Sequence, residues 1–251
     1  MSYKVEKVTP YNETQTKQEQ VIQLFDELAP QYDKLNGTLA LGIDNYWRKH
    51  AMRILKKYKP QHMLDIATGT GDFAILAHQL LQPKQIIGID ISDGMMAVGK
   101  EKVEAKGLQH VISFENQDCA AMTFDDNTFD AVTISFGVRN FEQIDQSFSE
   151  ILRVLKPGGI FMFIELTTPE KNPMKQLYNI YTKQVMPRIA NLLNTKKPNY
   201  EYLPHSIAAF PQGREMMLIL KKNGFTNIRL RRYTLGVATL YLAEKPIAYS
   251  K

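Results

Sequence analysis

The stretch MLDIATGTGDFA, residues 63–74, decides the fold of this chain. Its first half, MLDIAT, is a short and nearly continuous apolar run, which is typical of a strand covered on both faces. Two glycines follow, and the run DFAILAHQLL after them has the composition of a helix. A strand, a glycine-rich turn and a helix in this order predict the first unit of a doubly wound α/β sheet.

The alternation continues beyond this stretch. Four more strand-like runs follow at residues 85–91, 111–116, 129–136 and 159–166, and helical segments separate most of them. The chain closes with FTNIRLRRYT and VATLYLAEK, which have no helix between them. Two helical segments precede the first strand, and a long one spans roughly residues 173–194. We therefore expect an α/β fold with a mostly parallel seven-stranded sheet and a C-terminal antiparallel hairpin.

Length and composition favour one domain over residues 1–251, with N-terminal helices and a helical insertion around residues 167–212. The single Cys119 excludes an internal disulfide and any cysteine-cluster metal site, which favours the reducing cytoplasm. The polar N-terminal stretch predicts no signal peptide, and no run reaches the roughly 18 apolar residues of a spanning helix. We expect any membrane contact to be peripheral, at the inner face of the membrane.

The formal net charge of +5 permits an anionic partner, either nucleic acid or a lipid surface, without requiring one. The most basic run is RKHAMRILKKYK, residues 48–59. Its apolar residues recur at the spacing of an amphipathic helix. The simplest interpretation of this run is a helix with a solvated basic face.

The glycine loop has two candidate ligands, a dinucleotide and S-adenosylmethionine. Gly69-x-Gly71 with Asp90 roughly 20 residues further on matches the dinucleotide fingerprint, which is weak evidence alone. Asp65 at the strand end and Asp72 in the first helical turn would repel a pyrophosphate and attract a sulfonium and an ammonium group. We therefore interpret the loop as a site for S-adenosylmethionine, although Asp72 alone also suits a helix start.

Polar residues at the ends of the later strands fit the same ligand. Asp90 is suited to accept hydrogen bonds from the ribose hydroxyls, and the alternative is a buried acid satisfied by backbone amides. Asp118 is suited to the adenine amino group, with Cys119 supplying a backbone amide. Ser135 falls at the mouth between cofactor and substrate. All these positions share the carboxyl edge of the predicted sheet.

The chain resembles the class I methyltransferases, and specifically the ubiquinone and menaquinone biosynthesis C-methyltransferase family, from about Val21 to Lys245. DIATGTGD and RVLKPGG occur in many methyltransferases, whereas YDKLN combined with SFGVRN is much more specific. The resemblance also rests on YEYLPHSIAAFP, residues 200–211. It implies a Rossmann-like fold, the cofactor S-adenosyl-L-methionine, and cofactor contacts at Thr70, Asp90, Asp118, Cys119 and Ser135.

The resemblance further implies methyl transfer to a ring carbon of a polyprenyl hydroquinone such as demethylmenaquinol, in menaquinone or ubiquinone biosynthesis. A hydroquinone hydroxyl resembles a tyrosine phenol with a pKa near ~10, so a cation or donor beside its oxygen favours the reactive anion. Arg139 in SFGVRN is our candidate catalytic residue, and the alternative is a structural arginine paired with Glu142 or Glu165. Residues that suit the pocket wall or a proton relay are Tyr32, Tyr202 and His205.

The segment MKQLYNIYTKQVMPRIANLL, residues 174–193, has apolar residues along one helical face and is interrupted by Pro187. It suits either a helix packed on the sheet or a lid that admits an isoprenoid tail and touches anionic lipid. The partner we expect is therefore a lipophilic quinol, and the sequence leaves a homodimer open.

The rival functions on this fold are RNA methylation and O-methylation of a small molecule. SFGVR stands where amino-group methylases of nucleic acids carry an Asn-Pro-Pro-Tyr type motif, so we expect no nucleic-acid partner. A metal-dependent O-methyltransferase needs an acidic site, but Asp125-Asp126-Asn127 has the composition of a turn. We therefore expect no metal site.

Overall fold

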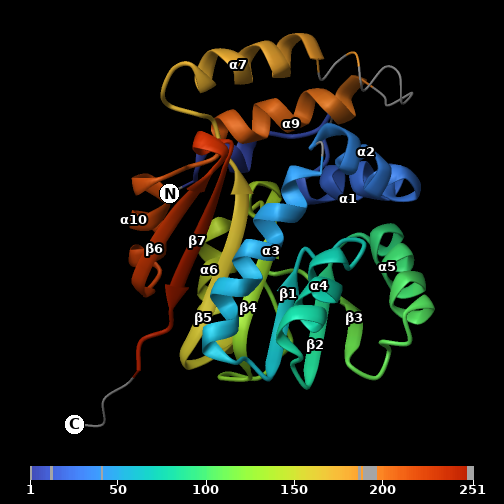
Figure 1. The fold of residues 1–251 in the computed structure, drawn as a ribbon, viewed down its shortest axis with the longest axis vertical. Helices are drawn as coiled ribbons and strands as arrows, with labels where there is room; N and C mark the ends of the chain where they lie inside the picture. The colour runs from blue at the N-terminus through green and yellow to red at the C-terminus, as the bar shows by residue number, and fades with distance from the viewer. Residues whose placement is uncertain (1, 12–13, 41, 186–187, 189–196, 248–251) are drawn as a thin grey trace.

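A seven-stranded sheet with helices on both faces forms the molecule (Figure 1). The computed structural model describes residues 2–11, 14–40, 42–185, 188 and 197–247. The sheet order is β3-β2-β1-β4-β5-β7-β6. The strands are β1 (His62–Ile66), β2 (Gln85–Asp90), β3 (Ile112–Asn116), β4 (Phe129–Ser135), β5 (Leu155–Leu166), β6 (Thr226–Tyr233) and β7 (Ala238–Glu244).

The first five strands pair in parallel, and β7 pairs antiparallel with both β5 and β6. The predicted mostly parallel sheet with a C-terminal antiparallel hairpin is confirmed. β1 lies between β2 and β4, so the strand order reverses beside it. In open α/β sheets the ligand crevice opens at such a reversal, outside the carboxyl ends of the strands.

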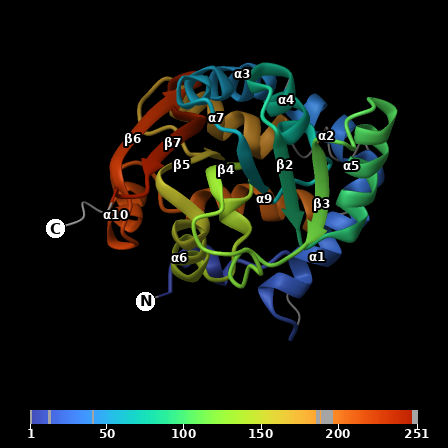
Figure 2. The ribbon, with the colours of Figure 1, turned by 90° about the horizontal axis from the view of Figure 1, so that it is seen from below.

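Two hydrophobic layers hold helices against the sheet. Helices α3 (Ile43–Leu55) and α4 (Asp72–Leu81) cover one face, and α6 (Ile144–Val154) and α10 (Arg214–Lys222) cover the other (Figure 2). Along β5, Phe161 and Phe163 point to the second layer while Met162 points to the first, as the two-residue period of a strand requires.

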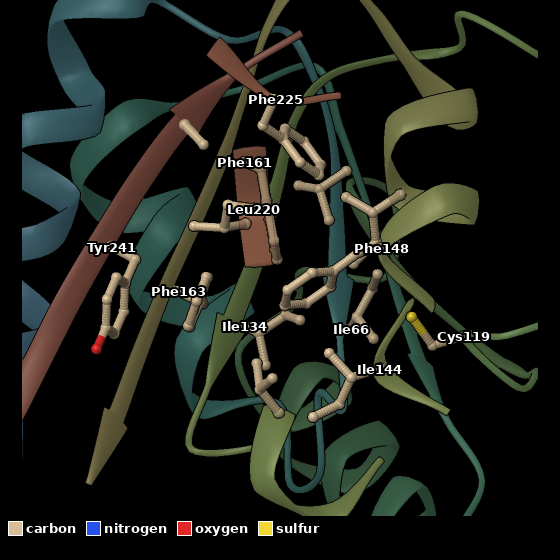
Figure 3. Close-up of a cluster of buried hydrophobic side chains, with 14 of the residues drawn as sticks. Ile66, Cys119, Ile134, Ile144, Phe148, Phe161, Phe163, Leu220, Phe225 and Tyr241 are labelled. Atoms are coloured by element: carbon tan, nitrogen blue, oxygen red, sulfur yellow. The ribbon is translucent and has the colours of Figure 1, made fainter. Parts of the chain in front are cut away.

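The core on the α6 side is rich in aromatic rings (Figure 3). Phe148 is fully buried, and its ring packs edge-on against Phe161 at 5.5 Å between centroids. Burial of such a side chain contributes about 1.5–3 kcal/mol. This packing fixes β4 and β5, and so fixes the 3-10 turn Val138–Asn140 that follows β4.

Among the described residues, three α-helices precede β1, where the sequence predicted two segments. They are α1 (Lys17–Leu28), α2 (Tyr32–Leu39) and α3. Pro30 lies in the 3-10 turn Ala29–Gln31 between α1 and α2, and Gly42, with a φ of 72°, precedes α3. A proline lacks the amide hydrogen that a continuous helix needs, and a positive φ ends a helix, so the segments separate.

The segment after β5 lies over the carboxyl edge of the sheet, together with α1 and α2 (Figure 1). It consists of α7 (Met174–Ile180), a π-helical turn (Tyr181–Val185) and α9 (Lys197–Ala209). No residue of α7 is buried, so the alternative of a helix packed on the sheet is wrong for this part. Pro187, Ile189 and Leu192 lie outside the described residues. None of the described helices combines the length and apolar character needed to cross a bilayer.

Candidate active site

The loop between β1 and α4 makes a tight turn that depends on its glycines. Gly69 and Gly71 have φ values of 55° and 75°, which L side chains rarely adopt. A Cβ atom on Gly71 would lie 2.9 Å from the ring of Phe114. The loop backbone therefore packs closely against the Phe114 ring of β3, directly before the first turn of α4.

Asp65 and Asp72 do not line the resulting cleft. Asp65 is buried and accepts hydrogen bonds from the hydroxyls of Thr68 and Thr133, at 2.8 and 2.6 Å. Burial raises the pKa of Asp65 to about 6, against the effect of these hydrogen bonds. Asp72 pairs with Lys102 at 2.6 Å. The sequence argument placed these two charges beside the ligand, and that part of it is wrong.

The negative charge of the cleft comes from other residues. Asp90, Asp118 and Glu142 line it, and the described lining contains no lysine or arginine. It also contains Gly69, Cys119 and Ser135, so the ends of four strands meet there as predicted. Thr70 and Gly71 lie outside the lining. The cleft still attracts a cation, but through residues later in the chain.

Backbone amides already bind Asp90. Its two carboxylate oxygens accept hydrogen bonds from the amides of Gly69, at 2.8 Å, and Ser92, at 3.0 Å. Loss of solvation raises the pKa of Asp90, although these amides oppose the shift. The structure therefore shows the interaction expected under the alternative interpretation of Asp90, an acid satisfied by backbone amides. A carboxylate oxygen accepts more than one hydrogen bond, so Asp90 retains capacity toward the cleft.

Asp118 and Cys119 both line the cleft but differ in their polar contacts and burial. Asp118 accepts a hydrogen bond from the amide of Ala120, at 2.8 Å, and one from the side chain of Gln18, at 3.2 Å. Cys119 is buried, and burial raises the pKa of its thiol well above the ordinary value. A thiol with a raised pKa is a poor nucleophile, so the structure does not favour covalent catalysis by Cys119.

Helices α1 and α2 form a cover over this cleft, which we call the N-terminal cover (residues 17–39). The cover is fastened by polar contacts: Asp26 accepts from the hydroxyl of Ser92 at 2.6 Å, and Asp33 accepts from the hydroxyl of Thr70 at 2.7 Å. Only about 90 Å³ of free volume remains beneath it. Ligand sites usually measure about 300–1,000 Å³, so the space beneath the cover in this conformation is smaller than a usual ligand site.

A second cavity of about 420 Å³ lies beside the cleft. Tyr32 and Phe136 line both spaces. The walls of the second cavity come mostly from α2, α3, α7 and α9, with contributions from the end of β5 and the segment after β4, and are mostly apolar. They include Trp47, Leu166, Met174, Leu177, Tyr178, Tyr181, Leu203 and Ile207. The predicted cofactor residues and a hydrophobic chamber are thus adjacent.

Arg139 projects into this cavity from the 3-10 turn Val138–Asn140, which follows β4. Its Nη1 donates to Glu165 Oε1 at 2.8 Å and to the carbonyl of Phe136, and its own amide donates to Glu165 Oε2 at 3.1 Å. Burial alone would lower the pKa of Arg139, but the charge of Glu165 raises it overall. Glu165, and not Glu142, is therefore its partner. Its Nε is buried and has no hydrogen-bond partner among the described residues.

The remaining predicted pocket residues divide. Tyr202 is buried and belongs to the lining of neither space, but its hydroxyl donates to Asn140 Oδ1 at 3.1 Å and so supports the Arg139 turn. Tyr32 lines both spaces. His205 is exposed and belongs to the lining of neither, so its predicted place in the pocket is wrong.

Sequence reasoning missed two buried cations. The Nζ of Lys17 on α1 donates to the carbonyls of Val5, Arg139 and Phe141, at 2.7, 2.9 and 3.1 Å. Burial lowers the pKa of Lys17 to about 7. Lys17 therefore holds the Arg139 turn from its backbone side.

Arg48 is the second of these, and it is buried, not on a solvated helix face. Its Nε donates to Ser135 Oγ at 3.1 Å, and its guanidinium lies over the ring of Phe136 at 5.4 Å. It also lies 3.7 Å from Asp72. Arg48 thus connects the cleft with the second cavity.

No group of three or more His, Cys, Asp or Glu within the described ranges is arranged to hold a metal ion. Asp125 to Asn127 precede β4, and Asn127 has a φ of 58°. This geometry confirms the predicted turn.

Comparisons with known proteins agree with the sequence motifs. Residues 13–245 match the model of the ubiE/COQ5 methyltransferase family. A demethylmenaquinone methyltransferase from Bacteroides fragilis is 52% identical over 245 residues, which are 98% of this chain and 100% of the relative. A ubiquinone/menaquinone biosynthesis C-methyltransferase UbiE from Geobacter sulfurreducens is 40% identical over 240 residues, covering 95% and 93%.

Solved structures share the fold at low sequence identity. The [4+2]-cyclase SpnF superposes with a TM-score of 0.68 at 17% identity and covers 92% of this chain and 97% of its own. A SAM-dependent methyltransferase from Aquifex aeolicus gives a TM-score of 0.56 at 19% identity, covering 78% and 89%. These likenesses show the class I methyltransferase fold and nothing more specific.

Proposed function

The chain belongs to the ubiE/COQ5 methyltransferase family, and on this premise we propose that it methylates a ring carbon of a polyprenyl hydroquinone, converting demethylmenaquinol to menaquinol. Its methyl donor is S-adenosylmethionine. The observation that carries the proposal is the contact between two spaces: an acidic cleft at the strand ends adjoins an apolar cavity that holds one buried arginine.

The cleft residues suit this donor. We propose that Asp90 accepts hydrogen bonds from the ribose hydroxyls and that Asp118 and the backbone at Cys119 bind the adenine. Gly69 and Ser135 contribute the floor and the mouth of the site, whereas Thr70 and Gly71 act indirectly, through the cover and the loop conformation. Acidic residues without a cation in the described lining favour a positively charged ligand over a phosphate-bearing one.

S-adenosylmethionine supplies an electrophilic methyl carbon when bound. The protein's task is then to align the ring, exclude water and activate the ring carbon. We propose that Arg139 favours loss of the proton from the neighbouring ring hydroxyl, because its cationic side chain stabilises the oxygen anion in a cavity of low polarity. That negative charge spreads to the adjacent carbon, which would form the new carbon–carbon bond as the bond between the methyl group and the sulfonium sulfur breaks and S-adenosylhomocysteine is left; the ring carbon would afterwards release its hydrogen as a proton.

Glu165 is a positioning residue in this scheme. It binds both the backbone amide and Nη1 of Arg139, so it fixes the guanidinium while Nε keeps no hydrogen-bond partner among the described residues. The apolar walls suit an isoprenoid tail, and they exclude the water that would weaken the interaction between Arg139 and the ring oxygen.

The test is turnover of purified protein with S-adenosylmethionine and a short-chain demethylmenaquinol kept reduced. The expected products are S-adenosylhomocysteine and the ring-methylated quinol, identified by mass spectrometry. Bulk RNA and a catechol serve as acceptors for the two rival functions. Turnover with RNA or the catechol, and none with the quinol, would show the proposal to be wrong.

We further propose peripheral membrane contact beside the cavity. Ile43 and Leu177 line the cavity and are exposed at its rim, and Ile180 on the next turn of α7 is 50% exposed. Lys175 and Lys183 are exposed in the same segment. Apolar residues flanked by lysines are typical of a surface that rests on anionic lipid.

Liposome flotation tests this contact: binding to vesicles with anionic lipid should exceed binding to neutral vesicles and should fall when Leu177 and Ile180 become Ser. Equal recovery of both proteins from both vesicle types would contradict it. The homodimer stays a prediction, which analytical ultracentrifugation tests.

A further inference from the structure

Asp44 is a buried acid in an apolar wall. It lies near the start of α3, is 7% exposed, and lines the second cavity. Its Oδ1 is buried and has no hydrogen-bond partner in the described part of the chain. Its Oδ2 lies 3.7 Å from Arg48 Nη1, which is longer than a hydrogen bond. A buried acceptor without a partner is costly, so a structural role alone explains Asp44 poorly.

A second residue of the same cavity lining also has an unpartnered polar atom. Three buried side-chain polar atoms lack partners among the described residues: Asp44 Oδ1, Arg139 Nε and His78 Nδ1. The first two line the second cavity, and His78 does not. The cavity lining therefore contains two charged residues, each of which retains one polar atom, an acceptor on Asp44 and a donor on Arg139, that no described residue binds.

A para-hydroquinone carries one oxygen at each end of its ring, which matches two separate polar contacts. We propose that Asp44 accepts a hydrogen bond from the hydroxyl opposite the one that faces Arg139, and that this contact selects the reduced substrate over the quinone. The inference rests on the proposed function. A carboxylate only accepts hydrogen bonds. It therefore binds a hydroxyl and repels the carbonyl oxygen that replaces it in the quinone.

Arg139 cannot make this distinction. Its Nε is a donor, and both a hydroxyl or phenolate oxygen and a carbonyl oxygen accept hydrogen bonds. Discrimination of the oxidation state falls to the acceptor, since only the quinol has a hydrogen to give it. Rejection of the quinone matters for this reaction because only the reduced ring has a hydroxyl whose deprotonation activates the neighbouring carbon.

Arg48 supports the orientation of Asp44. The two residues are four apart on α3, and Arg48 is itself held by Ser135 and by the ring of Phe136. If Asp44 served only to hold Arg48, its loss would weaken the binding of both oxidation states alike. The ratio of the two affinities therefore separates selection of the reduced ring from support of Arg48.

Trp47 supplies the probe, since it is the only tryptophan in the chain and it lines the cavity. Quenching of its fluorescence would be titrated anaerobically with 2-prenyl-1,4-naphthoquinone and with the borohydride-reduced quinol. The wild-type protein should bind the quinol more tightly. Asp44→Asn should lower the quinol-to-quinone affinity ratio about tenfold or more, because a charged acceptor binds a hydroxyl more strongly and an amide can donate to the carbonyl.

Asp145→Asn is the matched control, since Asp145 pairs with Lys222 and lines neither space, and it should keep the wild-type ratio. Thermal melting would establish that the variants fold, and Asp44→Ser would replace a variant that does not. Equal wild-type affinities for both forms, or an Asp44 variant with an unchanged ratio in a protein that still methylates the quinol, would overturn the Asp44 inference alone. A wild-type protein that neither binds nor methylates the quinol would instead overturn the proposed function.

Discussion

Substitution of Arg139 by Met tests whether the guanidinium acts on the substrate or only holds the fold together. Methionine keeps most of the side-chain length and removes the charge. It leaves Glu165, which is 0% exposed, without its cation. The Glu165 carboxylate retains hydrogen bonds from the backbone amides of Arg139 and Leu166, at 3.1 and 2.8 Å.

The expected loss of stability is large because one partner of a buried pair is removed. Breaking such a pair costs about 3–5 kcal/mol. At about 2–4 °C per kcal/mol for a chain of this size, the melting temperature of the variant should fall by about 6–20 °C. Adding Glu165→Gln removes the buried charge while keeping one acceptor for the backbone amides, so the double variant should recover roughly half of the lost stability.

Turnover should not recover with stability. Loss of a donor to a developing oxygen anion costs about 100- to 1,000-fold in turnover, and neither variant restores that donor. Affinity for S-adenosylhomocysteine, measured by calorimetry, should change far less, since Arg139 is not in the cleft lining. Arg153→Met, which breaks a partly exposed pair elsewhere, is the control. A double variant that regains turnover together with stability would refute a role for Arg139 in the chemistry.

Three further outcomes are expected. The pKa of Lys17, about 7 in the folded chain, lies below its unfolded value, so the unfolded chain binds more protons between these two values. The free energy of unfolding should therefore rise by up to about 1.4 kcal/mol per pH unit above pH 7. Urea unfolding at several pH values should show that Lys17→Met loses this increment, and an unchanged slope would contradict it. Gly71→Ala should lower the free energy of unfolding in urea by about 1–3 kcal/mol, and by more than Gly107→Ala. Both positions have a positive φ, but only a Cβ atom on Gly71 would meet a neighbour, the ring of Phe114 at 2.9 Å. Equal losses would mean that the Phe114 ring moves aside without cost. Asp33→Asn weakens the contacts of the N-terminal cover with Thr70 and Lys102, and should lower the free energy of unfolding by less than about 1 kcal/mol. Stopped-flow measurement should find faster release of S-adenosylhomocysteine from this variant. An unchanged release rate would show that Asp33 does not fasten the cover.

The sequence predicted the sheet, the hairpin and the strand-end residues because these follow from short-range periodicity. Asp90, Asp118 and Ser135 each end or follow an apolar run, and parallel strands bring such ends to one edge. Lys17 was not predictable this way, since it contacts the carbonyl of Arg139, 122 residues away. Contacts of this kind depend on how α1 packs against the finished sheet.

Arg48 did leave a signal in the sequence. Asp44 and Arg48 lie four residues apart, and Ala51, Met52 and Leu55 continue the same buried stripe of α3. A charged pair on an apolar stripe indicates burial, whereas the amphipathic spacing within residues 48–59 alone favours a solvated basic face. Asp65 shows the opposite difficulty: its carboxylate binds the hydroxyls of Thr68 and Thr133 and does not line the cleft, and no pattern in the sequence predicts these contacts.

The position of Tyr32 makes the traffic of the two ligands interdependent. This one residue, at the start of α2 and just beyond Pro30, contributes to the walls of both spaces, so a movement of α2 that opened the cleft would also open the cavity. We therefore expect the nucleoside and the hydrocarbon tail to be exchanged in the same opening event, and the frequency of that event would then set an upper limit on turnover.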